Sequence, residues 1–100
     1  MQYQITETDG KVVVKLIGDL YVKSVAALRE DVLQLITQGK TAYIFDMSDL
    51  QYIDSAGLGV MITFQKMVLK QGGGVRVRGL RGVVKELFVQ TRLDKVFTIE

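Results

Sequence analysis

The sequence of 100 residues contains no cysteine and no histidine. Without cysteine the chain forms no disulfide, offers no thiolate nucleophile and has no cysteine-based zinc site. Without histidine it lacks the commonest general base and the commonest metal ligand. Catalysis of the Ser-His-Asp or Cys-His type is therefore excluded within this chain. Neither a P-loop nor a Gly-x-Gly-x-x-Gly pattern occurs, so we expect no enzymatic activity, no cofactor and no bound metal.

Long apolar runs are also missing. The longest stretch without a charged residue covers residues 55–65, which is far shorter than the ~20 residues that a membrane-spanning helix needs. The first ten residues show neither the basic segment nor the apolar segment of a signal peptide. We therefore expect a cytoplasmic protein that is not inserted in a membrane.

Charge is unevenly distributed along the chain, although the net charge is only +2. Acidic residues outnumber basic ones in residues 1–60, and the reverse holds in residues 61–100. A basic region of this kind can bind nucleic acid, but here no aromatic side chains alternate with the charges to stack on bases. We therefore interpret it as solvated surface and expect no nucleic-acid partner. The basic residues concerned are Arg76, Arg78, Arg81, Lys85, Arg92 and Lys95.

The apolar periodicities predict a fold of alternating strands and helices. Asp9 and Gly10 favour a type I′ turn that joins the first two strands as a hairpin. Strands that alternate with helices require crossover connections, and hence a largely parallel sheet. We therefore predict a single α/β domain over residues 1–100, with a mixed, mostly parallel sheet of about five strands and about three helices. The predicted strands cover residues 3–7, 12–17, 41–47, 75–78 and 96–99, and the predicted helices cover residues 24–38, 55–71 and 81–90.

The stretch from residue 53 to residue 60 opens the second predicted helix. Asp54 and Ser55 are both good N-cap residues, because a short side-chain oxygen can accept a free helix N–H. Gly57 and Gly59 each cost about 1 kcal/mol relative to alanine inside a helix. Their presence so near the start predicts a close approach, either of packed backbone or of a partner molecule.

The residues alone leave three interpretations of this stretch open. In the first, Ser55 is a phosphoacceptor, since a phosphate there would meet the positive end of the helix dipole. In the second, three aspartates near the end of the third predicted strand form a magnesium site; they are Asp46, Asp49 and Asp54. In the third, Asp54 or Ser55 simply caps the helix and the glycines permit tight packing.

Four segments together resemble the STAS domain family, in particular bacterial anti-sigma factor antagonists. The most specific is the Asp-Ser-Ala-Gly-Leu-Gly-Val run of residues 54–60. Gly-Asp-Leu at residues 18–20 resembles a Gly-Glu-Leu element that follows the second strand of the family. Residues 44–50 resemble its third strand and loop, and residues 93–97 resemble its closing segment. The resemblance therefore covers nearly the whole chain.

The resemblance implies a phosphorylation switch. In such antagonists the serine of the Asp-Ser-x-Gly motif is phosphorylated by an anti-sigma factor serine/threonine kinase and dephosphorylated by a metal-dependent phosphatase. The unphosphorylated form captures the anti-sigma factor and thereby frees the sigma factor. Carried over, Ser55 is the phosphoacceptor and the chain is a substrate rather than a catalyst. The implied partner-binding residues are Asp19, Tyr21, Asp54, Ser55, Ala56, Gly57, Leu58 and Gly59.

The sequence departs from this pattern at three places. Tyr21 stands where many antagonists have aspartate, and Ala56 stands where some have a second serine. Many members also have a further helix after the segment that corresponds to the last residues here. A STAS scaffold or adapter without the phosphorylation switch, in a signalling or lipid-transport complex, is the alternative hypothesis.

Overall fold

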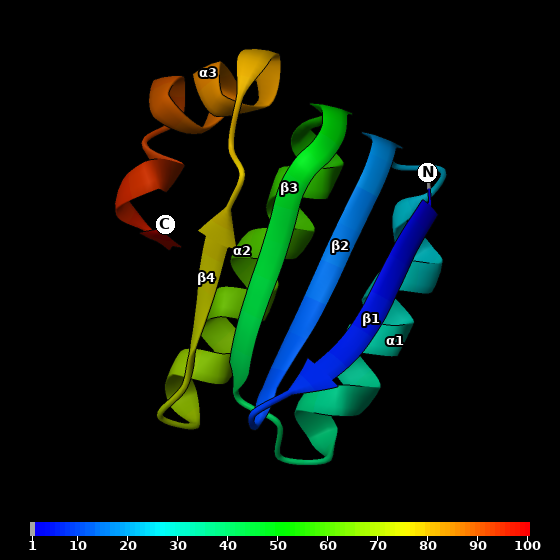
Figure 1. Ribbon diagram of the computed structural model, residues 1–100, viewed down its shortest axis with the longest axis vertical. Helices are drawn as coiled ribbons and strands as arrows, with labels where there is room; N and C mark the ends of the chain where they lie inside the picture. The colour runs from blue at the N-terminus through cyan, green and yellow to red at the C-terminus, as the bar shows by residue number, and fades with distance from the viewer. Residues whose placement is uncertain (1) are drawn as a thin grey trace.

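The computed structural model describes residues 2–100, and its centre is a five-stranded sheet with the strand order β1-β2-β3-β4-β5. β1 (Gln2–Thr8) and β2 (Lys11–Leu20) form an antiparallel hairpin. β3 (Ala42–Ile53), β4 (Gly74–Arg78) and β5 (Thr98–Ile99) follow β2 in parallel (Figure 1). The predicted fold class is therefore confirmed.

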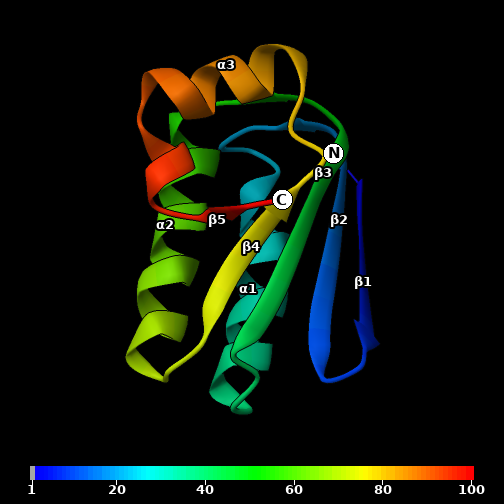
Figure 2. The ribbon, with the colours of Figure 1, turned by 60° about the vertical axis from the view of Figure 1, so that its left-hand side comes forward.

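Three α-helices pack around this sheet. α1 (Val25–Thr37) and α2 (Ser55–Lys70) lie side by side against one face, and Figure 2 shows both on the same side of the strands. α3 (Gly82–Gln90) lies across the end of the sheet at which β3 finishes, and a short 3-10 helix, Leu93–Lys95, follows it. Within residues 2–100 no helix is long and apolar enough to cross a membrane.

The core lies between the sheet and the helices α1 and α2. Side chains alternate between the two faces of a strand, and in each parallel strand the apolar set faces the helices. The helices contribute one apolar stripe each at 3.6-residue spacing. Fully buried members include Val14, Leu16, Phe45, Met47 and Val77 from the strands, and Leu28, Val32, Met61, Phe64 and Val68 from the helices.

The second and third strands are longer than their sequence pattern predicts. The predicted ends at residues 17 and 47 are wrong, because β2 continues to Leu20 and β3 to Ile53. The two strands stay paired across two register shifts, one of them beside Gly18, whose φ of 88° favours glycine. These irregularities break the alternation of apolar and polar residues, so the pattern alone does not reveal the extension.

The last strand, in contrast, is shorter than the sequence pattern predicts. Only Thr98 and Ile99 pair with β4, because the residues before them turn through the 3-10 helix. The buried Gln65 side chain of α2 holds this segment in place. Its Nε2 donates to the Val96 carbonyl at 2.7 Å, and its Oε1 accepts from the Val75 N–H at 2.8 Å.

The Tyr43 hydroxyl is buried and has no hydrogen-bond partner within residues 2–100. Its burial, with a smaller effect from the Glu7 carboxylate, raises the pKa of Tyr43 to about 12. An unfolded tyrosine titrates near 10, so at alkaline pH the unfolded state releases this proton before the folded state does. Between those two values the free energy of unfolding therefore falls as the pH rises.

We expect the Tyr43→Phe variant to be more stable than the parent by about 1 kcal/mol at neutral pH, because it removes an unsatisfied buried polar atom. The advantage should widen above pH ~10, since phenylalanine does not titrate. Urea unfolding at neutral pH and at about pH 11 measures both effects. A parent and a variant that lose equal stability between the two pH values would contradict this account.

Candidate functional site

Asp54 and Ser55 lie at the N-terminus of α2, at the end of the sheet where β2 and β3 finish. Asp54 is the N-cap, and its Oδ1 accepts the N–H of Gly57 at 2.9 Å. Ser55 is the first helical residue and is exposed. Of the two capping residues that the sequence offers, the structure therefore uses Asp54. The Ser55 hydroxyl makes no hydrogen bond to any other described residue, which leaves it accessible to a partner.

Gly57 and Gly59 occupy opposite environments, although they are two residues apart. A Cβ on Gly57 would lie 2.7 Å from Cγ1 of Ile53 and 3.0 Å from Cγ of Leu20, both of which are buried. A Cβ on Gly59 would meet nothing within 4 Å. The prediction of a close approach is thus confirmed for Gly57, as packed backbone. Gly57 is itself buried, so of the implied partner-binding residues it offers no exposed surface of its own.

The outer surface of the first two turns of α2 is uncharged. Ala56 and Leu58 are half-buried, Gly59 is exposed, and Thr63 turns its hydroxyl back to the Gly59 carbonyl at 3.0 Å. A partner that covers this surface therefore desolvates no charged side chain from it. This matters because removing an ion from water is far more costly than removing an apolar or a hydrogen-bonded group.

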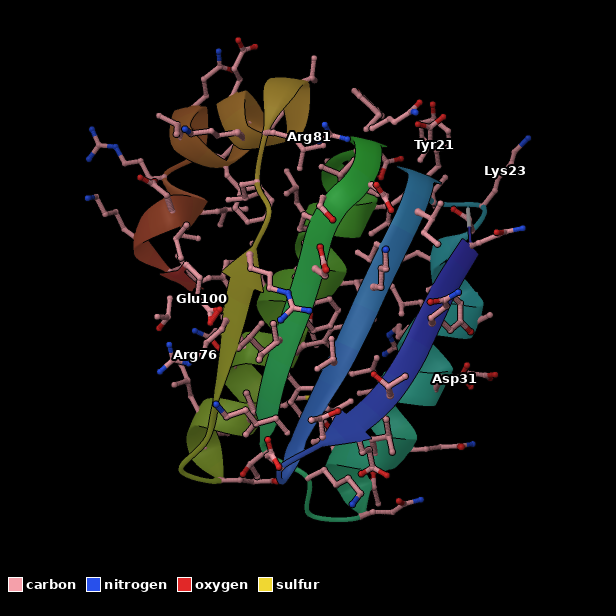
Figure 3. All side chains as sticks on the ribbon, viewed as in Figure 1. Tyr21, Lys23, Asp31, Arg76, Arg81 and Glu100 are labelled. Carbon is pink, nitrogen blue, oxygen red and sulfur yellow. The ribbon has the colours of Figure 1, made fainter. Side chains whose placement is uncertain are left out.

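The loop between β2 and α1 brings Tyr21 to the same end of the sheet (Figure 3). Its residues Tyr21 to Ser24 form a turn in which the Ser24 N–H donates to the Tyr21 carbonyl at 2.9 Å. The Tyr21 hydroxyl donates to Asp19 Oδ2 at 3.2 Å. Desolvation, together with this carboxylate, raises the pKa of Tyr21 above its ordinary value. The structure thus brings Asp19 and Tyr21 together, near the α2 N-terminus.

Two exposed apolar residues at this end were not predicted from the sequence as part of the site. Val22 is 62% exposed, and Tyr52 is 39% exposed. The ring centroids of Tyr52 and Tyr21 are 5.6 Å apart. The two rings meet because Asp19 pairs with Tyr52 in the extended part of the sheet. No signal in the sequence links positions so far apart, since the parallel register and its shifts arise only on folding.

The aspartates of the magnesium interpretation do not gather at one point. The Asp49 carboxylate pairs with Lys15 Nζ at 3.1 Å, and Asp46 lies within β3. Partial burial acts to raise the pKa of Asp46, but the hydrogen bonds from Ser48 and the Arg78 guanidinium outweigh it and hold that pKa below its ordinary value. Among the described residues no three acidic side chains come close enough to hold a metal ion together, so the structure does not support the magnesium interpretation.

The basic residues of the C-terminal part are spread over several elements. Arg76 Nη1 lies 3.9 Å from Glu100 Oε1, and Figure 3 shows these two side chains together at the β5 edge of the sheet. Arg81 is the N-cap of α3, near the end of β3 in Figure 3, and donates from Nε to the Ser48 carbonyl at 2.7 Å. The other members lie on β4, on α3, and in the 3-10 helix or at its N-cap. The absence of a nucleic-acid partner stays a prediction.

Comparison with known proteins relates the whole described chain to one family. The family model named STAS domain matches residues 2–100. The anti-sigma-B factor antagonist of Bacillus subtilis is 34% identical over 95 residues, which are 95% of this chain and 86% of that protein.

Solved structures show the same fold. The Bacillus cell fate determinant SpoIIAA in its phosphorylated form superimposes with a TM-score of 0.81 at 22% identity, over 99% of this chain and 91% of that one. An anti-sigma factor antagonist from Mycobacterium paratuberculosis superimposes with a TM-score of 0.86 at 23% identity, over 98% and 83% of the two chains. At these identities the likeness concerns the fold alone.

Proposed function

The chain belongs to the STAS domain family, and from this premise we propose that it is an anti-sigma factor antagonist that works by partner switching. The unphosphorylated form binds an anti-sigma factor that is also a serine/threonine kinase, and so releases the sigma factor. The kinase phosphorylates Ser55, which blocks binding, and a metal-dependent phosphatase restores the binding form. The protein acts as a substrate and a switch, in the cytoplasm, where transcription takes place.

One observation carries this proposal: the exposed Ser55 hydroxyl stands at a capped helix N-terminus in an uncharged surface. A phosphate adds a charge of about −1.5 to −2. The N-terminus of α2 tolerates that charge, because the helix dipole favours an anion there. A bound partner, in contrast, would have to remove the new charge from water at high cost. Phosphorylation can therefore abolish docking while the fold persists.

Hydroxyls on β3, on α2 and in the turn before α1 are less available. Ser48 Oγ donates to Asp46 Oδ1 at 2.7 Å, and Thr63 Oγ1 donates to the Gly59 carbonyl. Ser24 Oγ is engaged by the Tyr21 backbone. These intramolecular bonds compete with a kinase for each hydroxyl. We therefore expect phosphorylation at Ser55 rather than at its hydroxyl-bearing neighbours.

Incubation of the protein with the candidate anti-sigma kinase and ATP should place one phosphate on Ser55, as mapped by mass spectrometry. The Ser55→Ala variant is the control and should remain unmodified. Phosphate on Ser48 or Thr63, with Ser55 unmodified, would contradict the proposal. If Ser55 stays unmodified in cells while the chain is held in a signalling or lipid-transport assembly, the scaffold hypothesis is favoured instead.

A further inference from the structure

The carboxylate of Asp54 joins two elements that are far apart in the sequence. Oδ1 accepts the N–H of Gly57, inside α2, and Oδ2 accepts the N–H of Val22, in the loop between β2 and α1, at 3.1 Å. The backbone N–H of Asp54 also donates to the Leu20 carbonyl at 3.1 Å. Capping α2 requires only the bond from the Gly57 N–H. The second carboxylate bond, from the Val22 N–H, has a different consequence.

That second bond ties a turn of exposed side chains to the start of α2. The turn is closed by the Ser24 N–H to the Tyr21 carbonyl, and Ser24 Oγ accepts the Tyr21 N–H at 3.1 Å. Val22, the second residue of the turn, uses its own N–H on Asp54 instead. Among the described residues, no other side-chain hydrogen bond joins the turn to the α2 N-terminus. Tyr21 and Val22 are 43% and 62% exposed, and Figure 3 shows Tyr21 at this end of the sheet.

We propose that Asp54 is a positioning residue, which holds the exposed Tyr21–Val22 corner beside Ser55 as one preformed docking surface. This inference rests on the proposed function, since it concerns the surface that the anti-sigma kinase covers. Both carboxylate oxygens of the half-buried Asp54 already accept hydrogen bonds from the chain itself. In this proposal Asp54 acts on the partner through the turn that it holds, and the two bonds fix the carboxylate between the turn and α2. A turn ordered before binding loses less conformational entropy when the partner arrives.

The Asp54→Ser variant separates the two hydrogen bonds. Serine is a preferred N-cap residue, so the bond to Gly57 and the thermal stability of α2 are largely kept. A serine has one oxygen, and it leaves the Val22 N–H without an acceptor. We expect the Val22 amide to exchange its hydrogen at least fivefold faster by nuclear magnetic resonance, while the Gly57 amide stays protected. Affinity for the serine kinase that phosphorylates Ser55, measured without ATP, should fall about five- to tenfold.

The Val22→Pro variant breaks the same bond from the other side. Val22 is the second residue of a turn, a position that proline favours, and proline has no N–H to donate. Affinity should fall by a similar factor although the Asp54 charge is intact. Val22→Ala is the matched control, because it keeps the N–H and reports the loss of the side chain alone. It should bind more tightly than Val22→Pro.

The double variant decides between positioning and direct contact. If Asp54 acts through the Val22 N–H, combining Asp54→Ser with Val22→Pro should weaken binding by no more than about twofold beyond either change alone. The inference is overturned if the effects of the two changes on affinity multiply, or if Val22→Pro binds as tightly as Val22→Ala. Wild-type affinity of Asp54→Ser would overturn it too, while loss of binding in Ser55→Asp would still support the proposed function. If Ser55→Asp also binds like the parent, the proposed function itself fails.

Discussion

The Ser55→Asp variant is expected to bind the anti-sigma kinase at least tenfold more weakly than the parent, which corresponds to ~1.4 kcal/mol. The substitution places a second carboxylate next to Asp54. Residues 55–65 of α2 otherwise carry no charged side chain. Docking would then require the removal of that charge from water. The fold should be unaffected, because an acidic residue in the first turn of a helix interacts favourably with its dipole.

Two control variants test whether charge is the cause. Ser55→Asn has nearly the same size as Ser55→Asp but is neutral, so it should retain most of the affinity. Ser55→Ala should bind almost normally and lose little stability, since Asp54 rather than Ser55 caps α2. Isothermal titration calorimetry gives the affinities, and circular dichroism checks the fold. Equal loss in Ser55→Asn and Ser55→Asp would point to shape rather than charge, and parent-like binding of Ser55→Asp would place the docking surface elsewhere.

Alanine at Gly57 and alanine at Gly59 are expected to change stability in opposite directions. The Cβ of Gly57→Ala must displace the buried side chains of Ile53 or Leu20. We expect the free energy of unfolding to fall by about 1–3 kcal/mol, which is typical of overpacking in a core. Gly59→Ala enters open space and should gain up to ~1 kcal/mol from its better helix propensity. Urea unfolding of the two variants, which have identical composition, provides a matched comparison. Equal stabilities would show that Gly57 is not packed as described.

Substitutions at the same two positions also separate an effect on packing from an effect on partner binding. Gly59→Glu should keep the fold, because position 59 faces open space, yet it should weaken kinase binding by bringing a charged side chain onto the docking surface. Gly57→Ala should affect binding only as far as it disturbs the fold. A Gly59→Glu variant that binds like the parent would exclude this part of α2 from the docking surface.

The local chemistry of the sequence was enough for much of the fold. Asp9 and Gly10 have φ values of 53° and 76°, as a type I′ hairpin turn requires. The helical periods placed α1, α2 and α3 within a few residues of their observed bounds. The start of α2 followed from a capping residue before an apolar helix, and this in turn placed Ser55 at an exposed helix N-terminus. Each of these features depends on neighbours within one or two turns of chain.

Only the tertiary structure decided how the site is built. Gly57 and Gly59 look alike in the sequence, but one lies against Ile53 and the other faces open space. Tyr52 meets Tyr21 because β2 and β3 stay paired through two register shifts. Likewise, the capping bond of Asp54 follows from its place before a helix, whereas its bond to Val22 joins residues that only the fold brings together. Contacts across parallel strands depend on register and side-chain packing, and neither is encoded by spacing along the chain.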